Sequence, residues 1–456
     1  MERDIVVIGG GAAGYAAVSR ASRLSNRVTV VEKEHLGGMC VNWGCIPMQF
    51  LLHHVGLVRA IRQAEEEGIT LRGVHMDFQK LKKAKDGFVT SSTKRIKENL
   101  ETRKIEVIRG CARLVSPSEV EIELGDRTGQ IVHTKKILLA PGSVSKKLSV
   151  KGSDGEGVVT MKEALDFDPV PESAAIIGGG VIGLEIATLW ASLGCRASVV
   201  EIMPHLIPGE DLDVSLSVEQ ILKAQGIQIY TGSEVQEIED VRGGKSITIA
   251  GEAGKHKLSA QVVVLAMGQS PRIEGLGLER AGVAFDRKGI QTNKRMETTV
   301  PGIYAAGDAT GEMMLANVAM AQGLVAVENA TGGDETIDYR VIPRTVRTFP
   351  EIGAVGISEQ QALQRGLDIK VGKYLLKRNA KASILKDRSG FVKIIADAKS
   401  EEMVGMHILG PQATELIHEA VMAMQKRATV RDVASALHGH PCLHEAIQQA
   451  AFDMCR

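Results

Sequence analysis

Two stretches of the sequence decide the fold: residues 5–32 read IVVIGGGAAGYAAVSRASRLSNRVTVVE, and residues 175–201 read AIIGGGVIGLEIATLWASLGCRASVVE. Each contains an apolar strand, a glycine loop of the form G-x-G-x-x-G, a helical segment, a second apolar strand and a final glutamate. The third glycine and the glutamate are 18 positions apart in both copies. One such loop can be an ordinary glycine-rich turn, but two copies in matching context indicate a repeated dinucleotide-binding unit.

The residue types in these loops suit a pyrophosphate. The first glycine allows the tight turn from strand to helix, the second lets the backbone approach the phosphates, and the third lets the helix pack close to the sheet. The helix N-terminus offers N–H donors and a partial positive charge, and the glutamate suits the two hydroxyls of an adenine ribose. Two dinucleotides in one chain indicate electron transfer, usually between a flavin and a nicotinamide.

Length and composition agree with a large α/β protein. The 456 residues correspond to about three compact units, and 44% hydrophobic with 24% charged residues excludes a disordered or fibrous chain. The 55 basic and 55 acidic side chains balance, so charge gives no reason to expect nucleic acid or an anionic membrane as a partner. Long uncharged apolar stretches and a signal-peptide pattern are missing, so we expect no membrane span and a cytoplasmic location.

The rest of the chain falls into recognisable segments. Helical patterns cover 46–64 and 78–100, and short alternating strands cover 105–132. Buried strands run into turns at Gly142 and Gly268. From about Ile342 mixed strands and helices indicate a separate α+β domain. The expected strands are 353–357, 391–396 and 403–408, and the expected helices are 414–426 and 430–437. The predicted fold is α/β, with two Rossmann-like dinucleotide-binding domains and a C-terminal α+β dimerisation domain.

A pair of cysteines lies in the segment GGMCVNWGCIPMQ, residues 37–49. A structural zinc site is usually built from two C-x-x-C pairs, whereas these two cysteines are five positions apart and form a single pair. The sequence therefore predicts no metal site. Cys40 and Cys45, with Pro47 opening a helix directly afterwards, can close a small disulfide where the helix N-terminus lowers the pKa of a thiol. The alternative is two buried cysteines in a turn, which a neighbouring flavin site disfavours.

This segment resembles the redox-active disulfide of the pyridine nucleotide-disulfide oxidoreductases, the family of dihydrolipoamide dehydrogenase, glutathione reductase and mercuric reductase. Residues 305–308 (AAGD) resemble the family's second flavin motif, and residues 315–319 (LANVA) resemble the helix start beneath the flavin. Residues 438–445 (HGHPCLHE) resemble the C-terminal His-Pro motif. These motifs occur in the family's order, and the resemblance covers the whole chain.

The resemblance implies the chemistry. Cys45 would lie against the flavin, while Cys40 would exchange with the substrate disulfide. His440 matches the family's acid-base histidine and Glu445 its orienting carboxylate, and Asp308 would hold the ribityl chain. In the family the His-Pro motif reaches the partner subunit's disulfide, which implies a homodimer. The implied activity is FAD-dependent electron exchange between NAD(H) and a dithiol or disulfide.

Three features favour the dihydrolipoamide dehydrogenase branch, acting on lipoate carried by a protein or on a small disulfide. Glu201 would repel the 2′-phosphate of NADP. The chain ends in DMCR, with one thiol where mercuric reductases have a vicinal pair, and it has two redox cysteines where some relatives have one. The alternatives are an NADH-dependent reductase of another disulfide or of Hg(II), and a non-enzymatic flavoprotein subunit.

The chain also departs from the family's pattern. Gln49 takes the place of a lysine that pairs with the glutamate matching Glu185. We therefore expect Glu185 to titrate at a higher pH, or to accept a hydrogen bond from Gln49. Cys442 and His444 replace small hydroxyl residues in the C-terminal motif, and Asn317 stands where a histidine is common.

The predicted site residues fall into three sets. The catalytic residues are Cys40, Cys45, His440 and Glu445; the FAD residues are Gly9, Gly11, Gly14, Glu32, Gly38, Gly142, Asp308 and Ala316; the NAD residues are Gly178, Gly180, Gly183, Glu185, Glu201 and Gly268. The expected domains are 1–146 for FAD binding with the redox disulfide, 147–268 for NAD binding, 269–340 as a return segment completing the FAD site, and 341–456 for dimerisation.

Overall fold

The computed structural model describes residues 3–24, 27–66, 68–70, 73, 76–125, 127–252 and 254–455. The chain forms two compact units, each built from separate parts of the sequence. The first unit comprises Met1–His53, Ile69–Lys146 and Gly268–Ile337, and the second comprises His54–Gly68, Lys147–Met267 and Asp338–Arg456. The four domains expected from the sequence, with the three boundaries between them, stay predictions.

The first unit is organised around one mixed sheet with the strand order β3-β2-β1-β6-β5-β4, and β19 also pairs with β6. Strands β3, β2, β1, β6 and β19 are parallel to one another, whereas β4, β5 and the first part of β6 form an antiparallel extension. The bounds are β1 Arg3–Ile8, β2 Val28–Glu32, β3 Glu106–Arg109, β4 Cys111–Ser116, β5 Glu119–Leu124, β6 Arg127–Leu139 and β19 Ile303–Ala305. Strand β1 is buried from Ile5 to Ile8, as expected for a central parallel strand.

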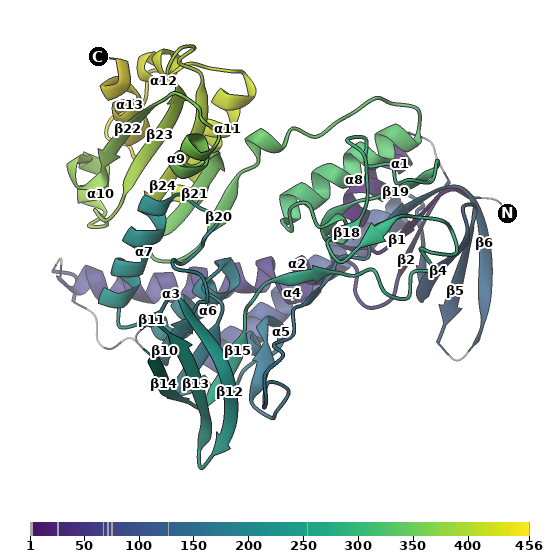
Figure 1. The fold of residues 1–456 in the computed structure, drawn as a ribbon, viewed down its shortest axis with the longest axis horizontal. Coiled ribbons are helices and arrows are strands. Elements are labelled where there is room, and N and C mark those ends of the chain that lie inside the picture. The colour runs from purple at the N-terminus through teal and green to yellow at the C-terminus, as the bar shows by residue number, and fades with distance from the viewer. Residues whose placement is uncertain are drawn as a thin grey trace. The chain divides into compact units, whose positions relative to one another are not determined.

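Several helices accompany this sheet, and one of them, α3, continues beyond His53 into the second unit. Helices α1 and α8 lie side by side (Figure 1), and their contact buries alanines of both. The bounds are α1 Ala12–Arg23, α2 Gly38–Asn42, α3 Cys45–Glu66, α4 Phe78–Thr102 and α8 Ala316–Ala330. Two short strand pairs complete the unit: β7 Ser143–Ser145 with β16 Gln269–Pro271, and β17 Phe285–Asp286 with β18 Gly289–Ile290.

The second glycine loop belongs to the parallel sheet of the second unit, with the strand order β11-β10-β9-β15-β8. The strand bounds are β8 Val158–Thr160, β9 Ser173–Ile177, β10 Arg196–Val200, β11 Gln228–Tyr230 and β15 Val262–Leu265, and the helices are α5 Met161–Ala164, α6 Val181–Ser192 and α7 Leu212–Ala224. An antiparallel meander follows β11, with strands β12 Ser233–Val241, β13 Gly244–Gly251 and β14 Gly254–Ala260. The sequence analysis did not predict this meander, which Figure 1 shows as a projecting three-stranded ribbon.

The C-terminal part of the second unit is an antiparallel sheet with the strand order β20-β21-β24-β23-β22. The bounds are β20 Arg344–Val346, β21 Glu351–Gly356, β22 Ile369–Leu375, β23 Phe391–Asp397 and β24 Met403–Gly410; the helices are α9 Glu359–Gln364, α10 Ala380–Ile384, α11 Ala413–Gln425, α12 Val430–Ser435 and α13 Glu445–Phe452. Apolar side chains of β23, β24, α11 and α13 form one core. The predicted α+β character is correct, although the sequence analysis missed strands β20 and β22 and helices α9, α10 and α13.

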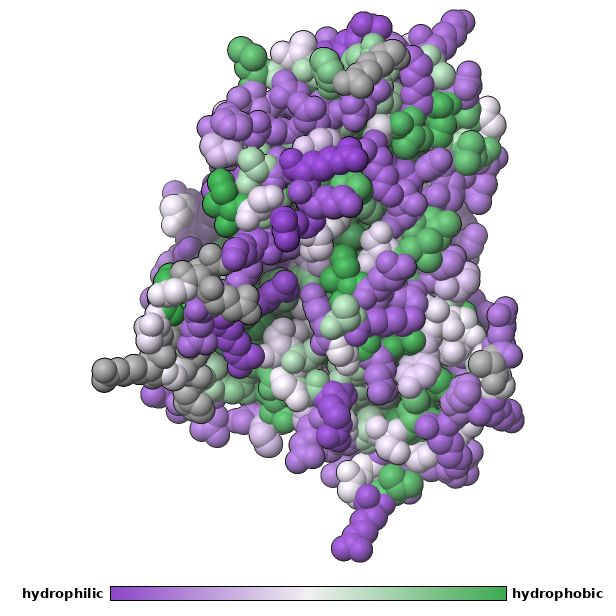
Figure 2. Space-filling model, turned by 90° about the vertical axis from the view of Figure 1, so that its left-hand side faces the viewer, coloured by the Kyte–Doolittle hydropathy of each residue, from purple (hydrophilic) through white to green (hydrophobic). Residues whose placement is uncertain are grey.

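The face of the molecule seen in Figure 2 is mainly polar. Figure 2 shows hydrophilic residues over most of the visible face, with hydrophobic residues in small separate groups. Among the described helices, none has the length and apolar character needed to cross a membrane.

Candidate active site

The two glycine loops have the same backbone geometry. Gly9 has a φ of +103° and Gly178 a φ of +113°, in the left-handed region that favours glycine. A Cβ on Gly14 would lie 1.9 Å from the carbonyl oxygen of Gly9, and a Cβ on Gly183 would lie equally close to that of Gly178. Both loops therefore need glycine to make the turn and to seat the helix against the sheet.

The helices that follow these loops begin with uncapped backbone donors. Helix α1 begins after Gly11 and helix α6 after Gly180, and among the described residues no side chain accepts a hydrogen bond at either N-cap. A Cβ on Gly180 would meet no atom within 4 Å, and a Cβ on Gly11 would come no closer than 3.8 Å to the Cα of Gly38. N–H donors beside open space, at the positive end of a helix, fit a pyrophosphate.

The glutamate at the end of each unit also occupies the same position. Glu32 accepts hydrogen bonds from the N–H of Gly10 at 2.7 Å and from the N–H of Glu34 at 2.7 Å. Glu201 accepts them from the N–H of Gly179 at 2.6 Å and from the N–H of Met203 at 2.8 Å. Each carboxylate is thus fixed beside its glycine loop, where a ribose would bind.

The two predicted redox cysteines lie in consecutive helices, in the part of the chain that belongs to the first unit. Cys40 is in α2 and Cys45 is the first residue of α3, and both are present as thiols. The hydrogen bond with Cys45 and burial raise the pKa of Cys40 far above its ordinary value, and the charge of Asp308 adds to this effect. Cys40 therefore needs a base to take its proton.

Asp308 lies in a short 3₁₀ turn, Gly307–Thr310, directly after β19. Its carboxylate accepts a 2.6 Å hydrogen bond from the hydroxyl of Ser143, and burial raises its pKa. The N–H of Gly307 donates to the side chain of Gln322 at 2.7 Å, which ties this turn to α8. The turn, α8 and the first glycine loop belong to the same unit.

The structure divides the predicted site residues between the two units. The first unit holds Cys40, Cys45, Gly9, Gly11, Gly14, Glu32, Gly38, Gly142, Asp308 and Ala316, and the second holds Gly178, Gly180, Gly183, Glu185, Glu201, His440 and Glu445. Gly268, predicted for NAD, lies in the first unit, where its carbonyl accepts from the N–H of Lys146 at 3.1 Å.

Glu185 lies in α6 and is buried. Burial raises its pKa to about 7, and the nearby Arg347 opposes this rise through its backbone N–H, which donates to Glu185 Oε1 at 3.0 Å, and through its charge. The direction agrees with the sequence prediction that Glu185 titrates high. Gln49 belongs to the other unit, so the predicted hydrogen bond between the two stays a prediction.

His440 and Glu445 form the pair that the sequence predicts. His440 Nδ1 lies 2.9 Å from Glu445 Oε1, and Glu445 Oε2 accepts from the N–H of Cys442 at 2.9 Å. The hydrogen bond from His440 and that from Cys442 lower the pKa of Glu445. The His440 side chain is 75% exposed, so a fixed carboxylate orients the ring while the ring itself stays open to solvent.

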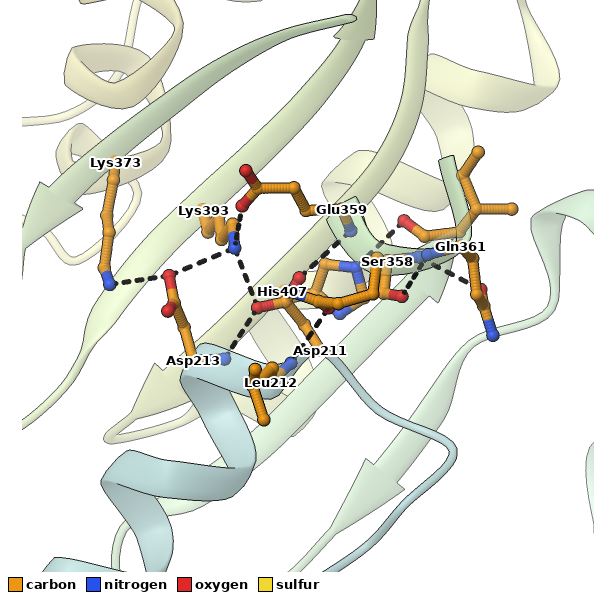
Figure 3. Close-up of polar contacts among 11 residues, drawn as sticks. Asp211, Leu212, Asp213, Ser358, Glu359, Gln361, Lys373, Lys393 and His407 are labelled. Atoms are coloured by element: carbon orange, nitrogen blue, oxygen red, sulfur yellow. Dashed lines mark hydrogen bonds and ion pairs between the residues drawn. The ribbon is translucent and has the colours of Figure 1, made fainter. Parts of the chain in front are cut away.

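The sequence analysis missed two polar clusters. One joins Glu419 of α11 to His438 and His444, at distances of 3.1 and 2.6 Å. The other surrounds the buried Lys393 of β23 (Figure 3), whose Nζ lies 2.6–3.0 Å from three carboxylates. Its acids are Asp211, Asp213 and Glu359. The replacement of a hydroxyl residue by His444 was the signal in the sequence for the first cluster; the second cluster had none.

Comparison with known proteins agrees with this geometry. The family model "Pyridine nucleotide-disulphide oxidoreductase" matches residues 3–323, and the dimerisation domain of the same family matches residues 342–451. The chain is 34% identical to a dihydrolipoyl dehydrogenase of Bacillus subtilis, over 99% of this chain and 97% of that protein. It is 36% identical to a dihydrolipoyl dehydrogenase of Thermus scotoductus, over 98% of this chain and 96% of the relative. The crystal structure of LpdA from Mycobacterium tuberculosis superposes with a TM-score of 0.91 at 28% identity, covering 99% of both chains.

Proposed function

Because the chain belongs to the pyridine nucleotide-disulphide oxidoreductase family, we propose that it exchanges electrons between NAD(H) and a dithiol or disulfide in the manner of a dihydrolipoamide dehydrogenase. The observation that carries this proposal is the pair of thiols, Cys40 and Cys45, in hydrogen-bond contact at the start of α3. Relatives named dihydrolipoyl dehydrogenase, aligned over almost the full chain, support the choice of substrate class.

The chain uses FAD and NAD(H), the cofactors of its family. The first glycine loop with Glu32, Gly38, Gly142, Asp308 and Ala316 would hold FAD, and the second loop with Glu201 would hold NAD(H). The uncapped helix N-termini and fixed carboxylates described above fit both dinucleotides. When bound, FAD supplies the relay of two electrons between the nicotinamide and the sulfur pair.

The two thiols have separate roles in this proposal. In the direction of disulfide reduction, the Cys40 thiolate attacks a substrate sulfur and forms a mixed disulfide, while the departing sulfur takes a proton. The Cys45 thiolate then attacks Cys40, so that the Cys40–Cys45 disulfide forms and the second substrate thiol leaves. Oxidation of a dithiol runs the same steps in reverse, and the raised pKa of Cys40 explains why a base is required.

His440 is the proposed base. Its Nδ1 faces Glu445, which leaves Nε2 to accept and return the proton of a substrate thiol or of Cys40. We further propose that the chain is a homodimer in which His440 serves the partner's cysteines. The matched dimerisation domain, which carries both His440 and Glu445, supports this arrangement.

A basic group in the C-terminal domain could guide an acidic lipoyl carrier to the site. It comprises Lys373, Lys377, Arg378, Lys381, Lys386 and Arg388. Lys373 is engaged by Asp213 at 2.8 Å and lies over the ring of Phe391, so its charge is partly neutralised. A rate that falls with salt for a lipoylated protein, but not for free lipoamide, would support docking at this group.

The function is tested by turnover of the holoenzyme with NAD or NADH against lipoamide, a lipoylated protein, glutathione disulfide and Hg(II). We expect the lipoyl substrates to be turned over fastest, and NAD(H) to be preferred over NADP(H) through Glu201. Faster turnover of glutathione disulfide or Hg(II) would assign a different substrate. NADH binding without flavin bleaching would indicate a non-enzymatic subunit.

The cysteine roles have their own test. Cys45→Ser should abolish the long-wavelength absorption that a thiolate beside a flavin gives after two-electron reduction. Cys40→Ser should keep that absorption and stop disulfide turnover. The reverse pattern would exchange the two roles.

A further inference from the structure

The C-terminal motif carries a second cluster beside the pair His440–Glu445. We propose that Glu419, His438 and His444 bind one divalent transition-metal ion of the Zn²⁺ class. Their candidate ligand atoms all lie within 4.8 Å of one another. His438 Nε2 is 3.1 Å from Glu419 Oε1, and His444 Nδ1 is 2.6 Å from Glu419 Oε2. One carboxylate thus faces two imidazole nitrogens, one with each oxygen.

The hydrogen bonds of His438 favour a metal ligand. Its Nδ1 lies 3.1 Å from the carbonyl oxygen of Ala436, so this nitrogen carries the proton. In a neutral ring the lone pair of Nε2 then points at Glu419 Oε1, another acceptor. Either a second proton or a cation must lie between these two atoms. A histidine that donates its other N–H to a backbone carbonyl has the orientation typical of metal-bound imidazole.

The ligand set indicates which ions fit. Two imidazoles and one carboxylate match the three protein ligands of zinc sites that keep an open fourth position. Imidazole favours Zn²⁺, Cu²⁺ or Ni²⁺ over Mg²⁺ and Ca²⁺, which prefer oxygen ligands. The His438 side chain is 12% exposed, whereas that of His444 is 43% exposed. The site therefore has an anchored side and a side open for ion entry and a solvent ligand.

The site is separate from the proposed acid-base pair, although both lie in the same segment. Glu445 contacts His440 and the N–H of Cys442, whereas the other cluster depends on Glu419 of α11. The two histidine rings of the cluster are stacked, with centroids 5.9 Å apart and an interplanar angle of 17°. A bound ion would fasten His438 and His444 to α11 without using a ligand atom of His440 or Glu445. The sequence analysis expected no metal because it considered only paired cysteines, whereas these ligands come from positions 19 and 25 residues apart.

The test is Zn²⁺ binding to chelator-treated FAD holoenzyme in the oxidised state, where the Cys40–Cys45 thiols do not compete. Calorimetry should show one Zn²⁺ per chain. His444→Ser, which restores a small hydroxyl residue, and Glu419→Gln should each weaken binding by more than about 10-fold. The matched control is His133→Gln, because His133 faces a single carboxylate, Glu119, at 3.4 Å and should not contribute.

Two further measurements make the result decisive. Retained FAD absorbance and an unchanged unfolding midpoint without metal show that each variant is folded. With Co²⁺ as the probe, a spectrum without thiolate-to-cobalt bands should accompany one-to-one binding. No stoichiometric binding, undiminished binding in both His444→Ser and Glu419→Gln, or thiolate-to-cobalt bands would overturn the proposal. None of these readouts requires turnover, so the result is independent of the disulfide substrate.

Discussion

Two groups of charged side chains in the second unit differ in their exposure to solvent: the cluster around Lys393 and the pair His440–Glu445. Lys393 is 1% exposed, and each of its three hydrogen-bond directions meets a carboxylate. Burial alone would lower the pKa of Lys393, but the hydrogen bonds to Glu359 and Asp211 raise it. His440 and Glu445 are also paired, yet the imidazole is largely exposed. Pairing of charges therefore does not distinguish a structural site from a chemical one; a nitrogen left open to solvent does.

The Lys393 cluster joins separate elements of its unit. Asp211 caps the N-terminus of α7 and accepts the N–H of Asp213 at 3.0 Å, and its other oxygen accepts the N–H of Glu359 at 3.1 Å. Figure 3 shows these groups converging on Lys393, with His407 next to them. Burial lowers the pKa of His407, so the ring stays neutral in this interior. This network holds α7, α9 and the C-terminal sheet together through a lysine whose three contacts all go to carboxylates of its own unit.

The largest effect on activity should come from the exposed pair His440–Glu445. We expect His440→Gln to lower disulfide turnover by about 10²–10⁴-fold, the usual contribution of a general acid-base group. Flavin reduction by NADH and the unfolding midpoint should stay near those of the wild type. Stopped-flow and steady-state kinetics separate these steps, with His418→Gln, an exposed histidine of α11, as the control. Wild-type turnover in His440→Gln would remove this residue from the chemistry.

The Lys393 cluster should give the opposite pattern, a large loss of stability with little change in turnover. Lys393→Met leaves the buried carboxylate of Asp211, and the partly exposed carboxylates of Asp213 and Glu359, without their cation. We expect a loss of about 3–5 kcal/mol in the free energy of unfolding, mainly because Asp211 is left buried and unpaired. Turnover of the folded fraction should change little. Urea unfolding followed by circular dichroism measures the loss. A variant as stable as the wild type would show that the apolar stem of Lys393 matters more than its charge.

Glu185 extends the comparison to a buried carboxylate that, unlike those around Lys393, has no lysine in contact with it among the described residues. Its pKa of about 7, against an ordinary 4.5, means that the folded chain keeps a proton that the unfolded chain releases between these values. The contribution of Glu185 to the free energy of unfolding is therefore complete below pH 4.5 and is lost as the pH rises from 4.5 to about 7. The shift corresponds to about 3 kcal/mol.

The measurement for Glu185 is the free energy of unfolding at about pH 5 and about pH 8. Glu185→Gln should be the more stable chain at the higher pH and should lose the part of the pH dependence that Glu185 causes. Parallel pH profiles for the two proteins would show that Glu185 is already charged in the folded chain.

The smallest effect should come from the rim of the Lys393 cluster. Lys373 contacts the same Asp213, but its side chain is 37% exposed. Lys373→Met should cost no more than about 1 kcal/mol, as for other exposed pairs and ring contacts. A loss as large as that of Lys393→Met would mean that the two lysines act as one buried unit.

Local patterns predicted the parts of the fold that depend on nearby residues. Both glycine loops follow from their spacing, and strands β21, β23 and β24 follow from apolar runs. Strand β12 was missed because most of its residues are polar, and its pairing with β13 depends on register rather than on composition. Helix α13 was missed because it is short and follows the His-Pro motif directly.

The site was predictable where a motif holds its residues together. His440 and Glu445 are five positions apart, so the motif alone placed them as neighbours. Lys393 lies in a strand in which six successive residues are buried, and a lysine in such a run ordinarily indicates the solvent side. Its partners Asp211 and Glu359 are distant in sequence, so only the fold could reveal them.

The glutamates at the ends of the two glycine units are held in place by the backbone, which lowers the entropy that their side chains would lose on nucleotide binding. Glu32 and Glu201 are each fixed by two backbone N–H groups before any nucleotide arrives. A carboxylate has about four lone-pair sites, so about two remain on each side chain for the ribose hydroxyls. The rotational entropy of these side chains is lost when the chain folds, not when the ligand binds. If the riboses bind at these glutamates as proposed, each would meet a preorganised acceptor, and more of its hydrogen-bond energy would be retained as affinity.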